Sequence, residues 1–300
     1  MANEANVSWP GWEVVRIIGR GSFGAVYEIR RDLFGTEESA ALKVISVPQN
    51  DSDIEVLLAN GYTVEDITKR FQDIREDIIH KYALMVGMRE HPNVVCCDDF
   101  RYVQHEDGTG WDICVKMELL ENLFVRGWRL PEAAVVTVGV DICAALTACE
   151  ESGLVHGHVV PNNILCTQDG LYKLGDVGIF SALNERTDGP VLDTPRSYMA
   201  PEIYHRHREP RTAAGDIYSL GLTMYRLLNE RRLPCEPLPP VIPPPMSAFR
   251  RFEGEPIPAP AHGSEELQQI VLKACSYDIE ERYHSARDML RDLMKYQESY

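Results

Sequence analysis

Runs of β-branched residues in the first part of the chain predict a small β-sheet. Segments 12–19, 24–31 and 38–47 are short, rich in valine and isoleucine, and separated by turn residues such as glycine. Segments 94–104 and 111–120 have the same character and flank the sequence HEDGTG, whose Asp-Gly pair is typical of a β-hairpin turn. We therefore expect strands to dominate the chain up to residue 120.

Between the two groups of strands, apolar residues recur every three or four positions. That spacing places them on one face of a helix, and the residues are Ile67, Phe71, Ile74, Ile78, Tyr82, Met85 and Met88. The sequence HPN at 91–93 ends the predicted helix, because the residue before a proline is disfavoured in the helical conformation. Segment 48–61, ahead of the helix, is polar, and no element is predicted there.

From residue 131 onward the pattern predicts helices. They are expected at 131–153, where a glycine ends the first one, and at 215–230, 264–275 and 285–297. We therefore predict a single domain of the α+β class over residues 1–300. It has a small β-rich N-terminal lobe of about residues 1–120 with one main helix, and a larger, mainly helical C-terminal lobe of about 121–300.

A proline-dense stretch, LPCEPLPPVIPPPMS, interrupts the helical region at 233–247. Its composition favours a stiff surface loop in the polyproline conformation. A segment that docks a partner protein is the alternative.

The charge balance narrows the classes of partner. The chain has 46 acidic and 30 basic residues and a formal net charge of -16, which disfavours nucleic acids and anionic membranes because both attract basic patches. Residues 1–12 show neither the basic region nor the apolar region of a secretory leader, so we expect none there, and no stretch approaches the roughly 18 apolar residues that a membrane span needs. The eight cysteines are scattered without a CxxC pair, which is typical of buried thiols in a reducing compartment. We therefore expect a cytoplasmic protein with no membrane segment.

Seven short motifs follow one another along the chain. They are GRGSFGAVY at 19–27, AALK at 40–43, HGHVVPNNIL at 156–165, DVG at 176–178, APE at 200–202, DIYSLG at 216–221, and Arg282 after CSYDIEE. Together they resemble the signature motifs of eukaryotic-type Ser/Thr protein kinases over nearly the whole chain. The resemblance implies a bilobal protein-kinase-like fold, with ATP and Mg²⁺ as its ligands.

The resemblance also assigns the residues that bind ATP. Glycines let a hairpin backbone approach the phosphates closely, and a strand lysine reaches the α- and β-phosphates as a point charge. Apolar side chains enclose the adenine ring beside a gatekeeper, Met117, and two hinge groups hydrogen-bond adenine: the Glu118 carbonyl and the Leu120 amide. The full set is Gly19, Gly21, Ser22, Phe23, Gly24, Val26, Ala41, Lys43, Met117, Glu118, Leu120 and Leu165.

Metal-binding and structural roles follow from the same motifs. Asn163 and Asp176 occupy the two metal-ligand positions, and both offer the oxygen atoms that Mg²⁺ prefers. The structural positions are a packing histidine, a buried ion pair and a carboxylate that accepts backbone hydrogen bonds from the catalytic loop. These are His156, the pair Glu202 and Arg282, and Asp216.

The catalytic loop departs from the family pattern where the chemistry is carried. The family has HRDxKxxN, whereas this chain has HGHVVPNN at 156–163. His158 replaces the aspartate that accepts the proton of the substrate hydroxyl, and Val160 replaces the lysine that neutralises the transferring phosphoryl group. Gly157 replaces the arginine that couples the loop to phosphorylation of the activation segment.

These replacements predict a large loss of rate. Losing a positioned base typically removes about 10² to 10⁴ in rate. Losing one electrostatic stabiliser removes about 10² to 10³ more, although the two factors need not multiply. His158 has a suitable unperturbed pKa, but a neutral imidazole brings no negative charge to orient a hydroxyl. We therefore do not expect efficient phosphoryl transfer.

A second departure lies on the predicted helix at 67–88. Counting back from HPN, Lys81 occupies the position where the family has a glutamate that pairs with the strand lysine, Lys43. Two ammonium groups about 4 Å apart repel by about 4 kcal/mol at an effective dielectric constant of 20. Asp77, one turn earlier on the same face, is a possible substitute. We therefore expect the helix to be rotated or displaced relative to that of an active kinase.

Three functions remain open at this point. The first is a pseudokinase that binds Mg-ATP and acts as a scaffold or regulator of a protein partner. The second is a Ser/Thr kinase with unusual chemistry that uses His158 as its base. The third is an interaction module without nucleotide. The sequence identifies no partner or substrate and no oligomeric state.

Overall fold

The structure is a computed structural model that describes residues 7–21, 24–126, 130–184, 196–205, 211–236 and 244–299. It divides into two compact units. The first comprises Met1–Glu90, Val95–Leu120 and Ala182–Leu192, and the second comprises His91–Val94, Glu121–Ser181 and Asp193–Tyr300. Each unit has a hydrophobic cluster of its own.

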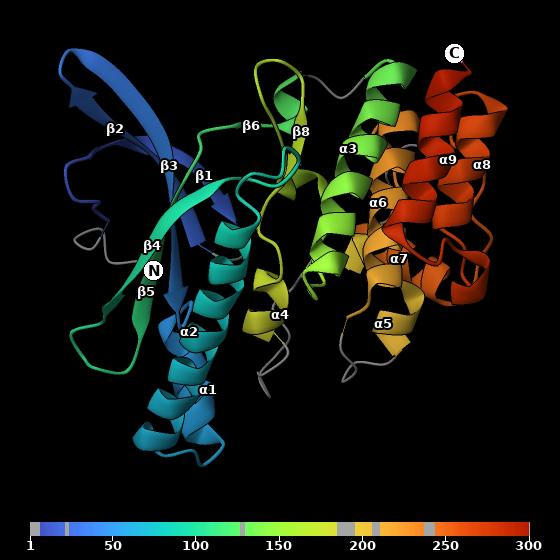
Figure 1. The fold of residues 1–300 in the computed structure, drawn as a ribbon. Coiled ribbons are helices and arrows are strands. Elements are labelled where there is room, and N and C mark those ends of the chain that lie inside the picture. The colour runs from blue at the N-terminus through green and yellow to red at the C-terminus, as the bar shows by residue number, and fades with distance from the viewer. Residues whose placement is uncertain are drawn as a thin grey trace. The chain divides into compact units, whose positions relative to one another are not determined.

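The first unit is built on a five-stranded antiparallel sheet (Figure 1). The strands are β1 Glu13–Gly21, β2 Gly24–Leu33, β3 Thr36–Val47, β4 Cys97–Gln104 and β5 Trp111–Met117. Their order is β1-β2-β3-β5-β4, so the hairpin of β4 and β5 joins the sheet through β5. The predicted strands and the predicted hairpin are confirmed.

The apolar face predicted for the main helix is buried. Helix α2 runs Val64–Gly87 and packs against β4 and β5. It begins with a capping box, in which the Thr63 side chain accepts from the Asp66 N–H and the Asp66 carboxylate accepts from the Thr63 N–H. It ends ahead of the HPN sequence. Its buried residues are Ile67, Phe71, Ile74, Ile78, Tyr82 and Met85.

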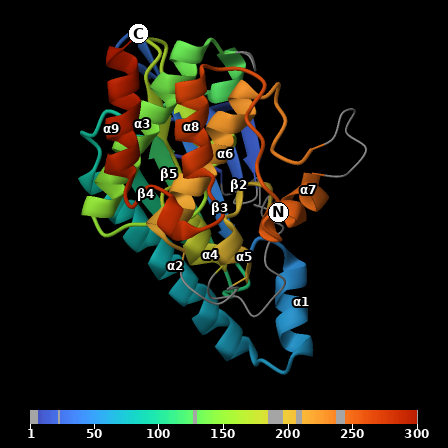
Figure 2. The same ribbon diagram turned by 90° about the vertical axis from the view of Figure 1, so that its right-hand side faces the viewer.

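The polar segment at 48–61 contains a helix that the sequence pattern did not predict. Helix α1 runs Asp51–Ala59 and packs against α2 (Figures 1 and 2). The side chain of Asn50 caps it by accepting from the backbone N–H of Asp53. Of the α1 side chains that are described, Leu57 is the buried one. A single buried position gives no periodicity, which is why the pattern does not predict this helix.

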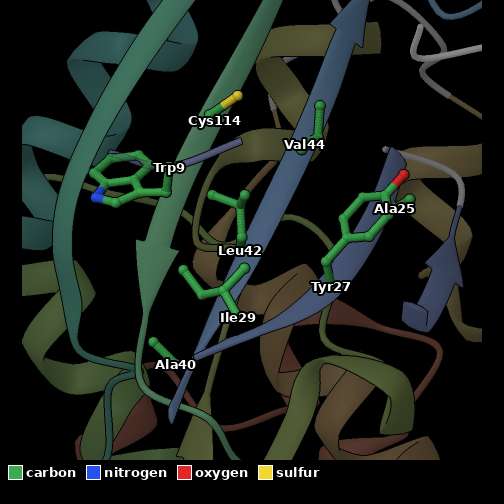
Figure 3. Close-up of a cluster of buried hydrophobic side chains, with 8 residues drawn as sticks. All are labelled: Trp9, Ala25, Tyr27, Ile29, Ala40, Leu42, Val44 and Cys114. Atoms are coloured by element: carbon green, nitrogen blue, oxygen red, sulfur yellow. The ribbon is translucent and has the colours of Figure 1, made fainter. Parts of the chain in front are cut away.

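One face of the first-unit sheet carries a compact apolar cluster (Figure 3). Trp9, from the segment before β1, lies against side chains of β2, β3 and β5. Successive residues of a strand point to opposite faces, so Ala41 and Lys43 of β3 lie on the other face of the sheet. The cluster consists of Trp9, Ala25, Tyr27, Ile29, Ala40, Leu42, Val44 and Cys114.

The second unit is mainly helical. Its strands are β6 Glu121–Asn122, β7 Ile164–Cys166 and β8 Tyr172–Leu174, which form a small sheet in that order. Its helices are α3 Glu132–Glu151, α5 Pro201–His205, α6 Ala213–Leu228, α7 Pro244–Phe252, α8 Glu265–Ala274 and α9 Ala286–Glu298. Helix α3 packs against α6 and α9, and α8 packs against the same two helices (Figures 1 and 2). The α+β class predicted from the sequence is confirmed.

Shorter elements complete the chain. Helix α4, Ile179–Asn184, follows β8 and the DVG motif. Turns of 3₁₀ helix lie at Leu123–Arg126, Pro161–Asn163, Arg196–Tyr198 and Ile279–Glu281.

The prediction of a polyproline loop is wrong for the end of the proline-dense stretch. Helix α7 begins within it, at Pro244 and Pro245. Proline fits the first turn of a helix because its missing N–H has no intrahelical partner there. Ala248 and Phe252 of this helix are buried. Residues 237–243 of the stretch lie outside the described residues.

Helix α3 is long and apolar enough for a membrane span, contrary to the sequence expectation that no segment would be. It is the one such helix among the described residues, and length and composition alone qualify it. Half of its apolar stretch (50%) is buried inside the fold, including Val135, Ile142 and Leu146. A buried core helix passes the same test because it is hydrophobic on all sides.

Candidate nucleotide-binding and catalytic site

Four of the predicted ATP-binding residues lie together on one face of the first-unit sheet. Val26 of β2 pairs with Lys43 of β3, and Ala41 of β3 pairs with Met117 of β5. Cross-strand partners share a face, and so do residues two apart on one strand. Lys43 is 5% exposed. A lysine ammonium beside small and apolar side chains suits a ligand that combines phosphates with a flat base.

The segment after β5, which the family uses as a hinge, is tied to the segment before β4. The backbone N–H of Glu118 donates to the carbonyl of Cys96 (3.1 Å), and the Glu118 carboxylate accepts from the Cys96 N–H (2.6 Å). Sequence reasoning assigned a role to the Glu118 carbonyl and missed this side-chain tie, because no local pattern indicates it. Leu120, the other predicted hinge residue, is half-buried at the end of this segment.

The glycine-rich turn between β1 and β2 is most constrained at Gly24. Its φ of 133° is rare for L side chains, and a Cβ there would lie 1.9 Å from the carbonyl oxygen of Val44. The β3 backbone therefore requires this glycine whatever the ligand. A Cβ at Gly21 would have no atom within 4 Å, and one at Gly19 would make an ordinary van der Waals contact with Cβ of Val26 at 3.9 Å. For these two, the close approach of phosphates stays a prediction. Two predicted residues of the turn lie outside the described residues: Ser22 and Phe23.

Helix α2 is fastened to the sheet by an arginine that sequence reasoning missed. The Arg75 guanidinium lies 4.8 Å from the ring centre of Tyr102 on β4 and 4.8 Å from that of Trp111 on β5. These contacts oppose rotation of the helix. Asp77 and Lys81 are half-buried, one turn apart on the same helix. The displacement of α2 that we infer from Lys81 stays a prediction.

In the second unit, a buried carboxylate of α6 holds the loop at 156–163. Asp216 accepts from the backbone N–H of His156 and from that of Gly157, both at 2.8 Å. Asp216 is 4% exposed. Burial raises its pKa to about 7, although the two backbone bonds and the nearby Arg211 lower that pKa. A helix side chain thus fixes the backbone of the loop.

His156 is a packing residue in this loop. It is fully buried. Its Nδ1 accepts from the backbone N–H of His158 (3.1 Å), so its Nε2 carries the proton and donates to the carbonyl of Gly175 (2.7 Å). Both ring nitrogens are occupied in holding the backbone of two neighbouring segments.

The side-chain amide of Asn163 is bound to His158 twice. Its Nδ2 donates to the His158 carbonyl (3.0 Å) and to Nδ1 of the His158 ring (3.1 Å). A carbonyl can only accept, which assigns the amide with its nitrogen toward His158. Because Nδ1 accepts a hydrogen bond, a neutral His158 carries its proton on Nε2. Its remaining nitrogen is then a donor.

The two predicted metal ligands are connected through a backbone bond. The N–H of Gly175 donates to the carbonyl of Asn163 (2.9 Å), and Asp176 follows directly. Asp176 has a φ of 60°, a left-handed conformation that aspartate tolerates better than most residues. The Asn163 amide nitrogen is engaged with His158, so Oδ1 is the atom left for a metal. A carboxylate and an amide oxygen are the hard donors that Mg²⁺ takes beside phosphate and water. These residues therefore fit a magnesium ion.

Val160 belongs to the hydrophobic core of the second unit. It is 5% exposed. Sequence reasoning treated this position only as the place of a missing cation, whereas its surroundings are apolar. A lysine here would have to place its stem and its charge in that cluster. The cluster consists of Val160, Tyr198, Ala200, Tyr218, Leu222, Leu233 and Cys275.

A bidentate ion pair lies deeper in the second unit. Arg282 donates from Nη1 and Nη2 to the two carboxylate oxygens of Glu202, each at 2.8 Å. Arg282 is 1% exposed, and its Nε donates to the carbonyl of Ser276 (2.7 Å). Leu165, the predicted adenine contact of this unit, lies half-buried on β7. Arg282 and Glu202 hold the fold, and the contact of Leu165 with adenine stays a prediction.

The protein kinase domain family matches residues 12–294, and the chain belongs to this family. The chain is 24% identical over 298 residues to a probable serine/threonine-protein kinase of Clostridium perfringens, covering 95% of this chain and 38% of that protein. It is 26% identical over 302 residues to a probable protein kinase of Dictyostelium discoideum, covering 95% and 72%. It is 30% identical over 220 residues to a serine/threonine-protein kinase, PknB, of Mycobacterium leprae, covering 68% and 33%. The chain therefore spans about a third of the length of two of these relatives.

Proposed function

We propose that the chain binds Mg-ATP and transfers the γ-phosphoryl group slowly at best, acting as a pseudokinase that regulates or scaffolds a protein partner. Membership of the kinase family supports ATP binding, and so do the retained Lys43, Asn163 and Asp176. The observation that carries the second half of the proposal is the double hydrogen bond from Asn163 to His158.

That contact prevents His158 from acting as the general base. A general base needs an unprotonated acceptor within hydrogen-bond reach of the substrate hydroxyl. With Nδ1 bound to the Asn163 amide and the proton on Nε2, neutral His158 has no acceptor nitrogen to offer. A ring that turned to present Nδ1 would give up its contact with Asn163. Base catalysis and the hold on a metal ligand therefore compete for one nitrogen.

Val160 supports the proposal through charge. A cation beside the transferring phosphoryl group stabilises the charge that develops in the transition state. An isopropyl group packed among Tyr198, Ala200 and Tyr218 supplies no such stabilisation. Both parts of the expected chemistry, proton acceptance and charge neutralisation, are missing at one loop.

Nucleotide binding is tested by a thermal titration with ATP, with and without Mg²⁺. A ligand at about 100 times its Kd stabilises by about 2.7 kcal/mol, so the unfolding midpoint should rise by about 5 °C or more. Lys43→Ala should abolish the shift, and Asp176→Ala should remove the part that depends on Mg²⁺. The absence of any shift for the wild-type chain overturns ATP binding and leaves the interaction module as the function.

The missing base is tested by a single replacement that leaves the core intact. In His158→Asp, one carboxylate oxygen can accept from Asn163 while the other accepts the substrate proton, so transfer to a peptide should rise about 100-fold. His158→Asn is the matched control, because an amide of the same shape cannot take a proton and should give no gain. Equal rates for the aspartate and asparagine variants would contradict the role given to position 158.

A working Ser/Thr kinase is the second candidate, because the relatives are named as kinases. In that case His158 must act as the base, and the rate of the wild-type chain should rise with pH through about 6.5, the ordinary pKa of histidine. Replacing His158 by alanine should then lower the rate by about 10² or more. The pseudokinase proposal predicts neither effect.

A further inference from the structure

An arginine reaches the catalytic loop from outside the motif. Arg211 lies just before Thr212, the residue that caps α6. Its Nη1 donates to the carbonyl oxygen of Gly157 at 2.6 Å. The Arg211 side chain is half-buried. No kinase motif that we identified in the sequence includes this residue.

Gly157 and Arg211 fit each other sterically. A Cβ at position 157 would lie 2.8 Å from Cδ of Arg211, closer than such atoms approach in proteins. Gly157 has a φ of 74°, which also favours glycine. A side chain at 157 and the arginine at 211 therefore compete for the same space, and this chain has the arginine.

Both backbone polar groups of Gly157 are held, one in each of its two peptide units. Its N–H donates to Asp216 in the first turn of α6, and its carbonyl accepts from Arg211 just before that helix. Arg211 also lowers the pKa of the buried Asp216, whereas burial and, to a smaller extent, Glu150 raise it. The cation thus favours the ionised carboxylate that accepts the two backbone bonds.

Gly157 is connected to the predicted metal ligand, Asn163, through His158. His158 follows Gly157 directly, and both its carbonyl and its ring accept from the Asn163 amide. The peptide between 157 and 158 is held at its carbonyl by Arg211 and at its N–H by Nδ1 of His156, and it thereby positions the residue whose carbonyl and ring orient Asn163. Partners that orient a metal ligand commonly change metal affinity by about 10- to 100-fold when they are removed.

We propose that Arg211, in the segment just before α6, is a positioning residue of the loop at 156–163. It acts through the Gly157 carbonyl and His158 on the orientation of Asn163. The proposal rests on the proposed function, in that Asn163 is taken to bind the Mg²⁺ of Mg-ATP.

The test is calorimetric titration with ATP, once with MgCl₂ and once with EDTA. Arg211→Ala should weaken binding of Mg-ATP about 10-fold and change binding of metal-free ATP by less than about 2-fold. Arg211→Lys, which keeps a cationic donor, should recover part of the loss, and it also serves if the alanine variant folds poorly. In an Asn163→Ala background, Arg211→Ala should have no further effect, because the path to the metal is already cut. Arg287→Ala, an exposed arginine on α9, is the control for charge alone.

A mutant cycle tests the steric match with Arg211. Gly157→Ala should weaken Mg-ATP binding in the wild-type chain and should weaken it less in the Arg211→Ala background, where the space is open. The proposal is overturned if Arg211→Ala weakens binding of metal-free ATP as much as binding of Mg-ATP. It is also overturned if the effects of Gly157→Ala and Arg211→Ala are additive. In both cases ATP binding itself stands. Failure of the wild-type chain to bind Mg-ATP overturns the proposed function and this inference with it.

Discussion

Two kinds of polar position in the second unit, structural and catalytic, differ in what the fold requires of them. Asp216, His156 and Arg282 are buried and make hydrogen bonds within the fold, and the Glu202 side chain that pairs with Arg282 is 13% exposed. His158, two residues after His156, replaces a charged group with a neutral one. Removing one partner of a buried polar pair leaves the other unsatisfied, and this destabilises the fold. A group that acts only in the transition state has no such partner in the folded protein. Replacing a structural polar group therefore destabilises the fold, whereas replacing a group that acts only in catalysis need not.

The largest effect is expected at the buried ion pair. Arg282→Ala should lower the free energy of unfolding by about 3 kcal/mol or more, because it removes a buried guanidinium and leaves the Glu202 carboxylate, 13% exposed, without its cation. Denaturant unfolding measures this change. Arg287→Ala removes an exposed pair with Glu151 and should cost no more than about 1 kcal/mol. Similar losses of unfolding free energy in Arg282→Ala and Arg287→Ala would contradict the distinction between structural polar groups and exposed ones.

A smaller loss is expected when the missing cation is restored. Val160→Lys should destabilise the fold by about 2–3 kcal/mol, because its charge enters an apolar cluster. Val160→Met, which adds length without charge, should cost less than about 1.5 kcal/mol. Thermal and denaturant unfolding of the two variants give the comparison. A lysine tolerated as well as methionine would mean that position 160 can still hold the family's cation.

The next smaller loss of stability is expected in the first unit. Arg75→Ala should cost about 1–2 kcal/mol, because it removes the contacts with Tyr102 and Trp111 at roughly 0.5–1 kcal/mol each. Lys69→Ala, on an exposed part of the same helix, should change stability by less than about 0.5 kcal/mol. Hydrogen exchange of α2 should increase in the first variant alone. Unchanged protection would mean that other contacts hold the helix.

The smallest effect is expected at the position of the missing base. His158→Ala should lower the free energy of unfolding by about 1 kcal/mol or less, the usual contribution of one hydrogen bond. Denaturant unfolding against the wild-type chain measures it. A loss as large as that of Arg282→Ala would make His158 a structural residue and weaken the comparison of the two kinds of position.

The elements with strong local patterns were predictable from the sequence. The β-branched strands and the apolar face from Ile67 to Met88 follow from periodicity, because each buries many side chains at a fixed spacing. Helix α1 buries Leu57 alone among its described side chains, so it has no such pattern. Helix α7 begins at prolines, which composition favours as loop.

The sequence predicts which positions form the candidate site, but not the physical surroundings of those positions. Motif spacing identifies Lys43, Asn163 and Asp176, because the chemistry requires those residue types. The contact of Arg211 with Gly157 joins residues 54 positions apart, and no local signal marks it. The apolar cluster around Val160 and the tie between His158 and Asn163 likewise depend on packing between distant segments or on side-chain geometry.

The most direct test of the account is the rate at which the purified wild-type chain transfers labelled γ-phosphate from Mg-ATP to a peptide. Protein kinases typically turn over about 1–100 times per second, and loss of the base alone predicts a rate at least about 100-fold lower. With the cation at position 160 also missing, the account predicts a rate well below about one turnover per second, and Asp176→Ala should lower whatever transfer remains. Turnover of about one per second or faster, abolished by Asp176→Ala, would contradict it and make the chain a working kinase.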